Sequence, residues 1–107
     1  MPPRWLLKAV SEIRSDARRE RVRFTAKAQD EISSLRLSLD DAIDVLLRLE
    51  AGDFRTRIAS RESGEWMYVF GTDLVGLPLY IKIVLGRSCR VVSFHEDAEG
   101  EDTDDDG

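Results

Sequence analysis

The sequence has few of the residues that build metal sites and disulfides. Its 107 residues include a single cysteine, Cys89, and a single histidine, His95. One cysteine cannot form a disulfide within the chain, and one cysteine with one histidine is too few for a zinc cage. We therefore expect neither an internal disulfide nor a metal or other cofactor.

Long apolar runs are also missing. No stretch approaches the ~18 apolar residues that a membrane span needs, and the segment MPPRWLLKAV has neither the apolar run nor the small-residue cleavage site of a signal peptide. These absences predict a cytoplasmic protein with no membrane partner. The chain length and the hydrophobic content of 42% fit one domain with a single modest core.

Basic residues are absent from the C-terminal end. Residues 96–107 hold eight of the 21 acidic residues and no lysine or arginine. The remaining 13 acidic residues face 16 basic ones, so residues 1–95 carry a net charge of +3. We predict a single domain over 1–95 and a disordered acidic tail over 96–107, because the tail has too little apolar surface to repay its ordering. The tail either aids solubility or folds back on a basic surface.

Three amphipathic helices are predicted in the first half of the chain. Apolar residues at helical spacing indicate the first helix over residues 6–19. Thr25 is a suitable N-cap for the second helix. Ser38 followed by Asp41 fits a capping box for the third, which Gly52 is well placed to end.

The apolar period then changes to two, which is typical of strands. The segments WMYVF, LYIKIVL and RVVSF alternate in this way, GTDLVG and GRSC are turn-like linkers, and DFRTRIAS and RVRF are weaker strand candidates. This order predicts an α+β fold, with N-terminal helices packed on one face of an antiparallel sheet. Alternation places these residues against the helices: Leu79, Ile81, Ile83, Leu85, Val92 and Phe94.

The opposite face of the last two predicted strands carries the polar residues Tyr80, Lys82, Ser93 and His95. Counting outwards from Gly86 and Cys89, on either side of a two-residue turn, places Tyr80 opposite His95. A histidine exchanges protons near neutral pH, and a tyrosine donates a hydrogen bond to developing negative charge. Further cations for a phosphate come from the predicted strand DFRTRIAS.

This combination suits RNA cleavage without a metal ion. The reaction deprotonates a ribose 2′-OH, offsets phosphate charge and protonates the leaving 5′-oxygen. The basic body fits a polyanionic substrate, and Trp66 or Tyr68 would stack an unpaired base. The residues alone also leave simpler interpretations open: His95 as a solvent-facing residue at a strand end, and Trp66, Tyr68 and Phe70 as core residues.

Four segments occur in a characteristic order and spacing: RVRFTAKAQDEISSLRLSLDDAIDVLLRLEAGDF, WMYVF, LYIKIVL and VVSFHED. Together they resemble the MqsR family of bacterial toxins, small RelE-like ribonucleases of type II toxin–antitoxin pairs. The resemblance runs from about Leu6 to Glu96. It implies a RelE-like fold and an mRNA endoribonuclease activity that arrests growth. It also implies a cognate antitoxin with a zinc-binding domain and a helix-turn-helix DNA-binding domain.

The resemblance further implies which residues form the active site. Tyr80 stands at the position of the family's catalytic tyrosine, and His95 stands where the family has a lysine. A histidine at that position replaces a fixed cation by a group that transfers protons near pH 7. Tyr80 and His95 are therefore the candidate catalytic residues.

Two other family positions are changed. Thr56 stands at a lysine position, between Arg55 and Arg57, and Met67 stands at a glutamine position. These four residues and Lys82 are the candidate RNA-binding residues. Two hypotheses follow: a ribonuclease in which the histidine is the general acid or base, or a non-catalytic module of the same fold that binds the antitoxin or RNA.

Overall fold

The computed structural model describes residues 1–61 and 63–97. In this part of the chain, the helices are α1 (Arg4–Arg18), α2 (Ala26–Ser34), α3 (Leu39–Leu47) and a short 3-10 helix, η1 (Ala51–Asp53). A single sheet is formed by β1 (Val22–Phe24), β2 (Phe54–Ala59), β3 (Trp66–Leu74), β4 (Leu77–Leu85) and β5 (Cys89–Glu96). The predicted α+β fold, with its helices N-terminal to most of the sheet, is confirmed.

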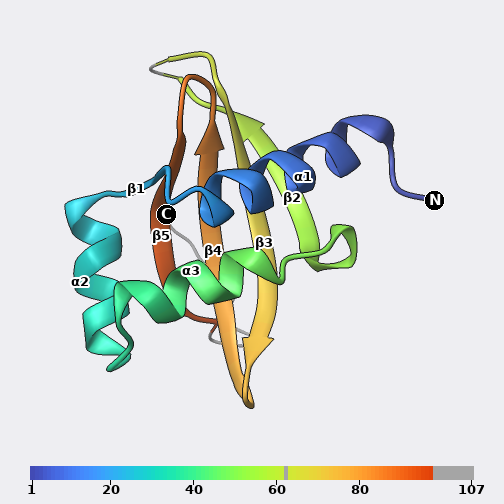
Figure 1. Cartoon of the computed structure of the whole chain (residues 1–107). Coiled ribbons are helices and arrows are strands. Elements are labelled where there is room, and N and C mark those ends of the chain that lie inside the picture. The colour runs from blue at the N-terminus through green and yellow to red at the C-terminus, as the bar shows by residue number, and fades with distance from the viewer. Residues whose placement is uncertain (62, 98–107) are drawn as a thin grey trace.

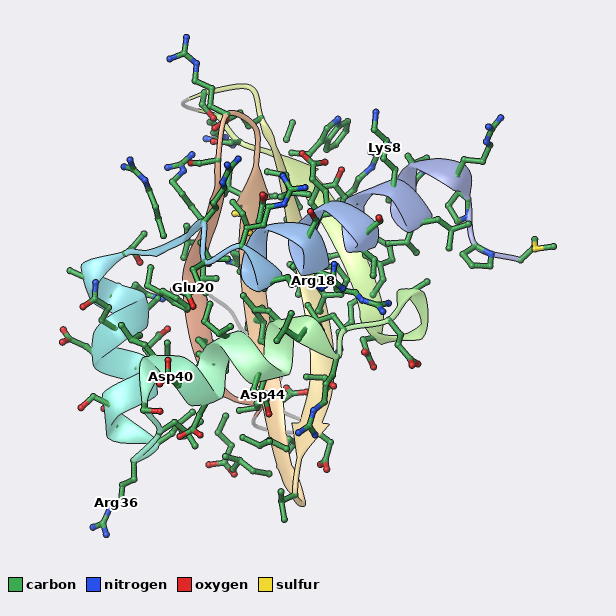
Figure 2. The ribbon with its side chains drawn as sticks, viewed as in Figure 1. Lys8, Arg18, Glu20, Arg36, Asp40 and Asp44 are labelled. Atoms are coloured by element: carbon green, nitrogen blue, oxygen red, sulfur yellow. The ribbon has the colours of Figure 1, made fainter. Side chains whose placement is uncertain are left out.

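The helices and the sheet form two layers. Helices α1 and α3 cross one face of the sheet, and α2 lies beside β5 (Figure 1). Both layers supply fully buried side chains to one core, among them Ile13, Ile32, Leu46 and Leu49 from the helical half and Phe70, Ile81 and Phe94 from the sheet. Exposed charged residues on the helices include Lys8 and Asp44 (Figure 2). We call the sheet face opposite α1 and α3 the open face.

The predicted helix caps are present. The Ala28 N–H donates to Thr25 Oγ1 at 3.1 Å at the start of α2. Ser38 and Asp41 exchange both hydrogen bonds of a capping box at the start of α3. However, α3 ends at Leu47, well before Gly52, and η1 follows it. The N-terminal boundaries were predictable because a cap and its partner are only three residues apart.

The strands run in the order β1-β5-β4-β3-β2. Strands β2 to β5 form an antiparallel meander, as predicted, but β3 continues into the segment expected to be a turn. Only Val75 and Gly76 connect β3 to β4, both with positive φ (49° and 86°), as a type I′ turn requires. At the other edge, β1 pairs with β5 in parallel, so the sheet is mixed rather than purely antiparallel.

A β-bulge at Val92 divides β5 into two stretches. Before the bulge Val91 lies opposite Ile83, and after it Ser93 lies opposite Lys82, so Val92 has no partner on β4. Val91 is fully buried in the core, whereas Val92 is only partly buried. The prediction that Val92 faces the helices is wrong, because the bulge interrupts the alternation on which that prediction rests.

The bulge also sets the register at the far end of the hairpin. The hairpin closes on Leu85 and Cys89, so its turn has three residues rather than the two assumed in counting. The unpaired bulge residue compensates for this difference, and Tyr80 lies opposite His95, as the counting predicts. A regular ladder from the same closure would place His95 opposite Leu79, on the core side of the sheet.

The folded chain continues past the predicted domain boundary at residue 95. Strand β5 ends at Glu96, and the Asp97 N–H donates to the Pro78 carbonyl oxygen at 2.9 Å. The rest of the predicted acidic tail, residues 98–107, lies outside the described residues. Among the residues that are described, no helix is long and apolar enough to cross a membrane.

Candidate functional site

Tyr80 and His95 are direct partners across β4 and β5 on the open face. Their rings stack with centroids 4.8 Å apart and 13° between the ring planes. His95 Nδ1 lies 2.9 Å from the Glu96 carbonyl oxygen. A carbonyl oxygen only accepts hydrogen bonds, so Nδ1 carries the hydrogen and Nε2 is left to exchange protons with a substrate.

The Tyr80 hydroxyl is suited to donate a hydrogen bond. Burial raises the pKa of Tyr80 above its ordinary value, the Arg55 guanidinium opposes this rise, and the Asp97 carboxylate adds to it. The phenol therefore stays protonated at neutral pH. The Arg55 guanidinium and the Asp97 carboxylate are therefore the charged groups close enough to influence the Tyr80 hydroxyl.

A second row of residues lies next to the ring pair. Lys82 is opposite Ser93, and Lys82 Nζ is 5.9 Å from the centroid of the Tyr80 ring. Ser93 is almost fully buried, and its Oγ lies 3.0 Å from Lys27 Nζ of α2 as a hydrogen-bond acceptor. Two lysines from different elements thus reach the same part of the open face.

Sequence reasoning does not find Lys27. Its Nζ also pairs with Glu31 Oε2 at 3.0 Å, and a lysine four residues from a glutamate is ordinary on any exposed helix. Glu31 Oε1 in turn accepts from the Phe94 N–H at 2.8 Å, which ties α2 to β5 beyond the end of β1. Only the packing of α2 against β5 shows that Lys27 belongs to this face.

Arg55 reaches the site from β2 by crossing β3. It lies in an irregularity of β2, where the register shifts between Phe54 and Thr56. Gly71 on β3 is the partner of Tyr80, and a Cβ at Gly71 would overlap the Arg55 guanidinium. The missing side chain at residue 71 therefore provides the path by which the Arg55 guanidinium approaches Tyr80.

Asp97 completes this cluster. Arg55 Nη2 lies 2.5 Å from Asp97 Oδ2, and the two side chains are 47% and 21% exposed. Composition alone assigns Asp97 to the acidic tail, and no sequence signal separates it from the acids that follow. The structure instead brings it to the same face as Tyr80.

Arg57 lies on the opposite face of the sheet. Its partner on β3 is Tyr68, which is only 6% exposed and belongs to the core. The Arg57 guanidinium carbon lies 3.7 Å from the Trp5 ring centroid and 3.9 Å from that of Trp66. The structure therefore does not bring Arg57 to Tyr80, and Tyr68 is too buried to stack a base.

The chain matches a family model described as "Motility quorum-sensing regulator, toxin of MqsA" over residues 3–96. The chain belongs to the MqsR toxin family. The family description names a toxin with a partner, MqsA, and the match covers every helix and strand described above. No curated protein sequence matches the chain.

Two open-face positions differ from what the resemblance to the MqsR family implies. Thr56, at a lysine position, lies opposite Val69, one row away from Tyr80. Met67, at a glutamine position, lies four residues along β3 from Gly71, the partner of Tyr80, or roughly 13 Å at the rise of a strand. A threonine hydroxyl still hydrogen-bonds a phosphate, whereas Met67 offers only apolar contact.

The single cysteine of this MqsR family member is a core residue. Cys89 is fully buried, and burial raises the pKa of its thiol to about 12, with Asp16 and Glu12 adding to the rise. A thiol in this environment is a poor nucleophile. Over residues 1–61 and 63–97, histidine, cysteine, aspartate and glutamate form no group of three or more that would hold a metal ion.

Proposed function

We propose that this MqsR family toxin is an mRNA endoribonuclease that acts without a metal ion. The observation that carries the proposal is the stacked pair of Tyr80 and His95 on the open face. The pair places a proton-transfer group beside a hydrogen-bond donor, and Lys82, Lys27 and Arg55 supply positive charge around it. Proton transfer, charge neutralisation and hydrogen bonding are what this chemistry requires.

In the proposed reaction, the ribose 2′-oxygen attacks the adjacent phosphorus. The 2′-oxygen–phosphorus bond forms and the phosphorus–5′-oxygen bond breaks, which yields a 2′,3′-cyclic phosphate and a 5′-hydroxyl. His95 acts through Nε2 as the general acid or base. The Tyr80 hydroxyl donates to a non-bridging phosphate oxygen, and the lysines with Arg55 offset the charge that builds up in the transition state.

The family description supports an antitoxin as the partner of this toxin. We propose that the cognate antitoxin has a zinc-binding domain and a helix-turn-helix DNA-binding domain, as the resemblance implies. We place the toxin in the cytoplasm, where its mRNA substrate is.

A non-catalytic module is the second candidate, and Thr56 and Met67 are the observation that favours it. These residues lack the cation and the amide that the family resemblance implies at their positions. In this alternative the open face still binds RNA or the antitoxin through its cations, but it does not cleave.

Cleavage of a labelled single-stranded RNA in the presence of EDTA distinguishes the two candidates. Wild-type protein is expected to produce cyclic-phosphate ends, and His95→Ala to cleave about 10²- to 10⁴-fold more slowly. Lys8→Ala is the control, because Lys8 is exposed on α1 (Figure 2). RNA that is bound but intact identifies the binding module. Equal cleavage by wild type and His95→Ala refutes the assigned site.

Growth on induced expression provides an independent readout. Wild type is expected to arrest growth, and co-expression of an antitoxin to restore it. If His95→Ala arrests growth as strongly as wild type, the toxicity does not arise from cleavage at this site.

A further inference from the structure

Transfer of a phosphoryl group from the 5′-oxygen to the 2′-oxygen needs both a proton acceptor and a proton donor, on opposite sides of the phosphorus. The proposed site has one histidine for these two tasks. Lys82, Lys27 and Arg55 are cations with no lone pair to offer, and Tyr80 is protonated at neutral pH. A second proton-transfer group is therefore missing from the site that the sequence predicts.

We propose that Asp97 is this second group, acting as the general base while His95 acts as the general acid. This inference rests on the proposed ribonuclease function. It concerns a residue that composition assigns to the acidic tail rather than to the site.

The backbone places the Asp97 side chain beside the ring pair. The Asp97 N–H bonds to the Pro78 carbonyl oxygen, so the chain continues the ladder with β4 for one residue beyond β5. Residues two apart on an extended strand share a face, roughly 7 Å apart. His95 and Asp97 are thus adjacent residues of the open face, and one phosphate group is within reach of both side chains.

Other open-face carboxylates near the ring pair are engaged elsewhere. Both oxygens of Glu31 have partners, Oε1 with the Phe94 N–H and Oε2 with Lys27. Asp73 also has one bonded oxygen, but its Oδ2 accepts from the Gly76 N–H, which holds this carboxylate at the β3–β4 turn and not at Arg55. Asp97 is held through Oδ2 alone among its described contacts, which leaves Oδ1 to accept a proton.

Arg55 holds both the base and the substrate in this arrangement. Its guanidinium lies at Gly71, the partner of Tyr80, and pairs with Asp97. A guanidinium has five N–H groups, so it can donate to Asp97 and to a phosphate oxygen at the same time. The ion pair fixes the direction of the carboxylate, and the Asp97 charge is felt at Tyr80, whose pKa it helps to raise.

The protons balance in a single step. The Asp97 carboxylate takes the 2′-OH proton and becomes a carboxylic acid as the 2′-oxygen bonds to phosphorus. The protonated His95 imidazole gives its Nε2 proton to the 5′-oxygen as that bond breaks. The products are the 2′,3′-cyclic phosphate, a 5′-hydroxyl, neutral His95 and protonated Asp97, and exchange with water restores the starting protonation states.

The test compares Asp97→Asn with Asp44→Asn in RNA cleavage between about pH 4 and about pH 9. Asp44 is a matched control, because it is also an arginine-paired aspartate, with Arg48 at 2.9 Å, but lies on α3 (Figure 2). Asp97→Asn is expected to lower kcat about 10²- to 10⁴-fold with KM changed little. It is also expected to lose the acidic limb of the pH–rate profile. Asp44→Asn is expected to match wild type.

Rescue by formate distinguishes a general base from a residue that only supports the fold, because formate replaces the base and not the structural contact. Asp97→Ala removes the carboxylate, and added formate is expected to restore part of kcat by supplying a small base. Thermal melts of both Asp97 variants show whether they are folded. If a variant does not fold, Asp97→Glu is compared with Asp97→Gln, which differ only in the presence of a carboxylate.

Three results would overturn the proposal. Asp97→Asn cleaving as fast as wild type, or faster, would show that the carboxylate merely occupies Arg55 and competes with the phosphate. A loss confined to KM with an unchanged pH profile would make Asp97 a binding residue. Failure of formate to raise kcat of a folded Asp97→Ala would exclude a base at this position. Wild type that never cleaves would instead refute the proposed function itself.

Discussion

The His95 imidazole lies on the Tyr80 ring at a centroid distance of 4.8 Å, nearly parallel to it. This contact covers one face of the imidazole and limits its rotation. Nδ1 is bonded to the Glu96 carbonyl oxygen, so the ring edge that carries Nε2 remains available. The stack therefore orients the group that we propose to transfer protons. It also separates two roles of Tyr80, because the ring contacts the histidine and the hydroxyl is the group that we propose to donate a hydrogen bond to the phosphate.

Replacing Tyr80 by phenylalanine separates these two roles. Tyr80→Phe keeps the stack and removes the hydroxyl, so cleavage is expected to fall about 10²-fold, as when one donor to a developing oxyanion is lost. Because the Tyr80 pKa is raised, the deficit is expected to persist from about pH 5 to about pH 9. Single-turnover cleavage measures it, and Tyr68→Phe is the control in the core. Equal rates for Tyr80→Phe and wild type would leave the hydroxyl without a role.

Adding a methyl group at Gly71 tests the path of Arg55. In Gly71→Ala the new Cβ overlaps the guanidinium, which must move away from Tyr80. We expect about a tenfold loss in cleavage, the size of one charge-assisted hydrogen bond, and little change in the melting temperature, because the Arg55 side chain is flexible. Gly52→Ala is the matched control, since no atom lies within 4 Å of a Cβ there. If both variants cleave alike, the position of Arg55 is irrelevant to activity.

Substitutions of two arginines on β2, Arg55 and Arg57, are expected to have opposite effects on cleavage and on stability. Arg57→Ala removes a guanidinium from between Trp5 and Trp66 and is expected to lower the free energy of unfolding by about 1–2 kcal/mol, from two cation–π contacts. Its cleavage is expected to stay within about twofold of wild type. Arg55→Ala is expected to lose cleavage while its half-exposed ion pair changes stability by less than about 1 kcal/mol. Urea denaturation and RNA cleavage, measured on both variants, check this reversal.

The bulge in β5 is tested by two adjacent valines. Val91→Ala creates a cavity in the core and is expected to cost about 2 kcal/mol of unfolding free energy, whereas Val92→Ala, at the bulge, is expected to cost less than about 1 kcal/mol. Unbroken alternation would give the reverse order. Chemical denaturation of the two variants decides between the two registers.

Local patterns in the sequence were sufficient for most of the elements. Thr25 and Ser38 cap helices through atoms three residues away, so their sequence neighbourhood contains the whole interaction. Strand alternation likewise separates Tyr80 and Lys82 from Ile81, the core residue between them. The pairing of Tyr80 with His95 was predicted correctly only because the longer turn and the bulge compensate for each other.

Relationships between distant parts of the chain could not be predicted in this way. The sequence shows no reason for Lys27 to reach Ser93, which is 66 residues away, or for Arg55 to reach Asp97, which is 42 residues away. The face on which Arg57 lies depends on the register shift between Phe54 and Thr56 in β2, which no residue type in the sequence predicts. The acidic composition of residues 96–107 also assigns Asp97 to the tail and not to the folded domain, because composition averages over all the acidic residues of that segment.

The position of β5 in the sheet bears on when the site comes into being during synthesis. This strand is the last of the described strands to leave the ribosome, yet it lies between β4 and the early strand β1. Before it emerges, β1 has no partner in the sheet, the core lacks Phe94, and Tyr80 has no histidine beside it. The proposed site therefore cannot be complete until β5 has been synthesised and has paired with both β4 and β1.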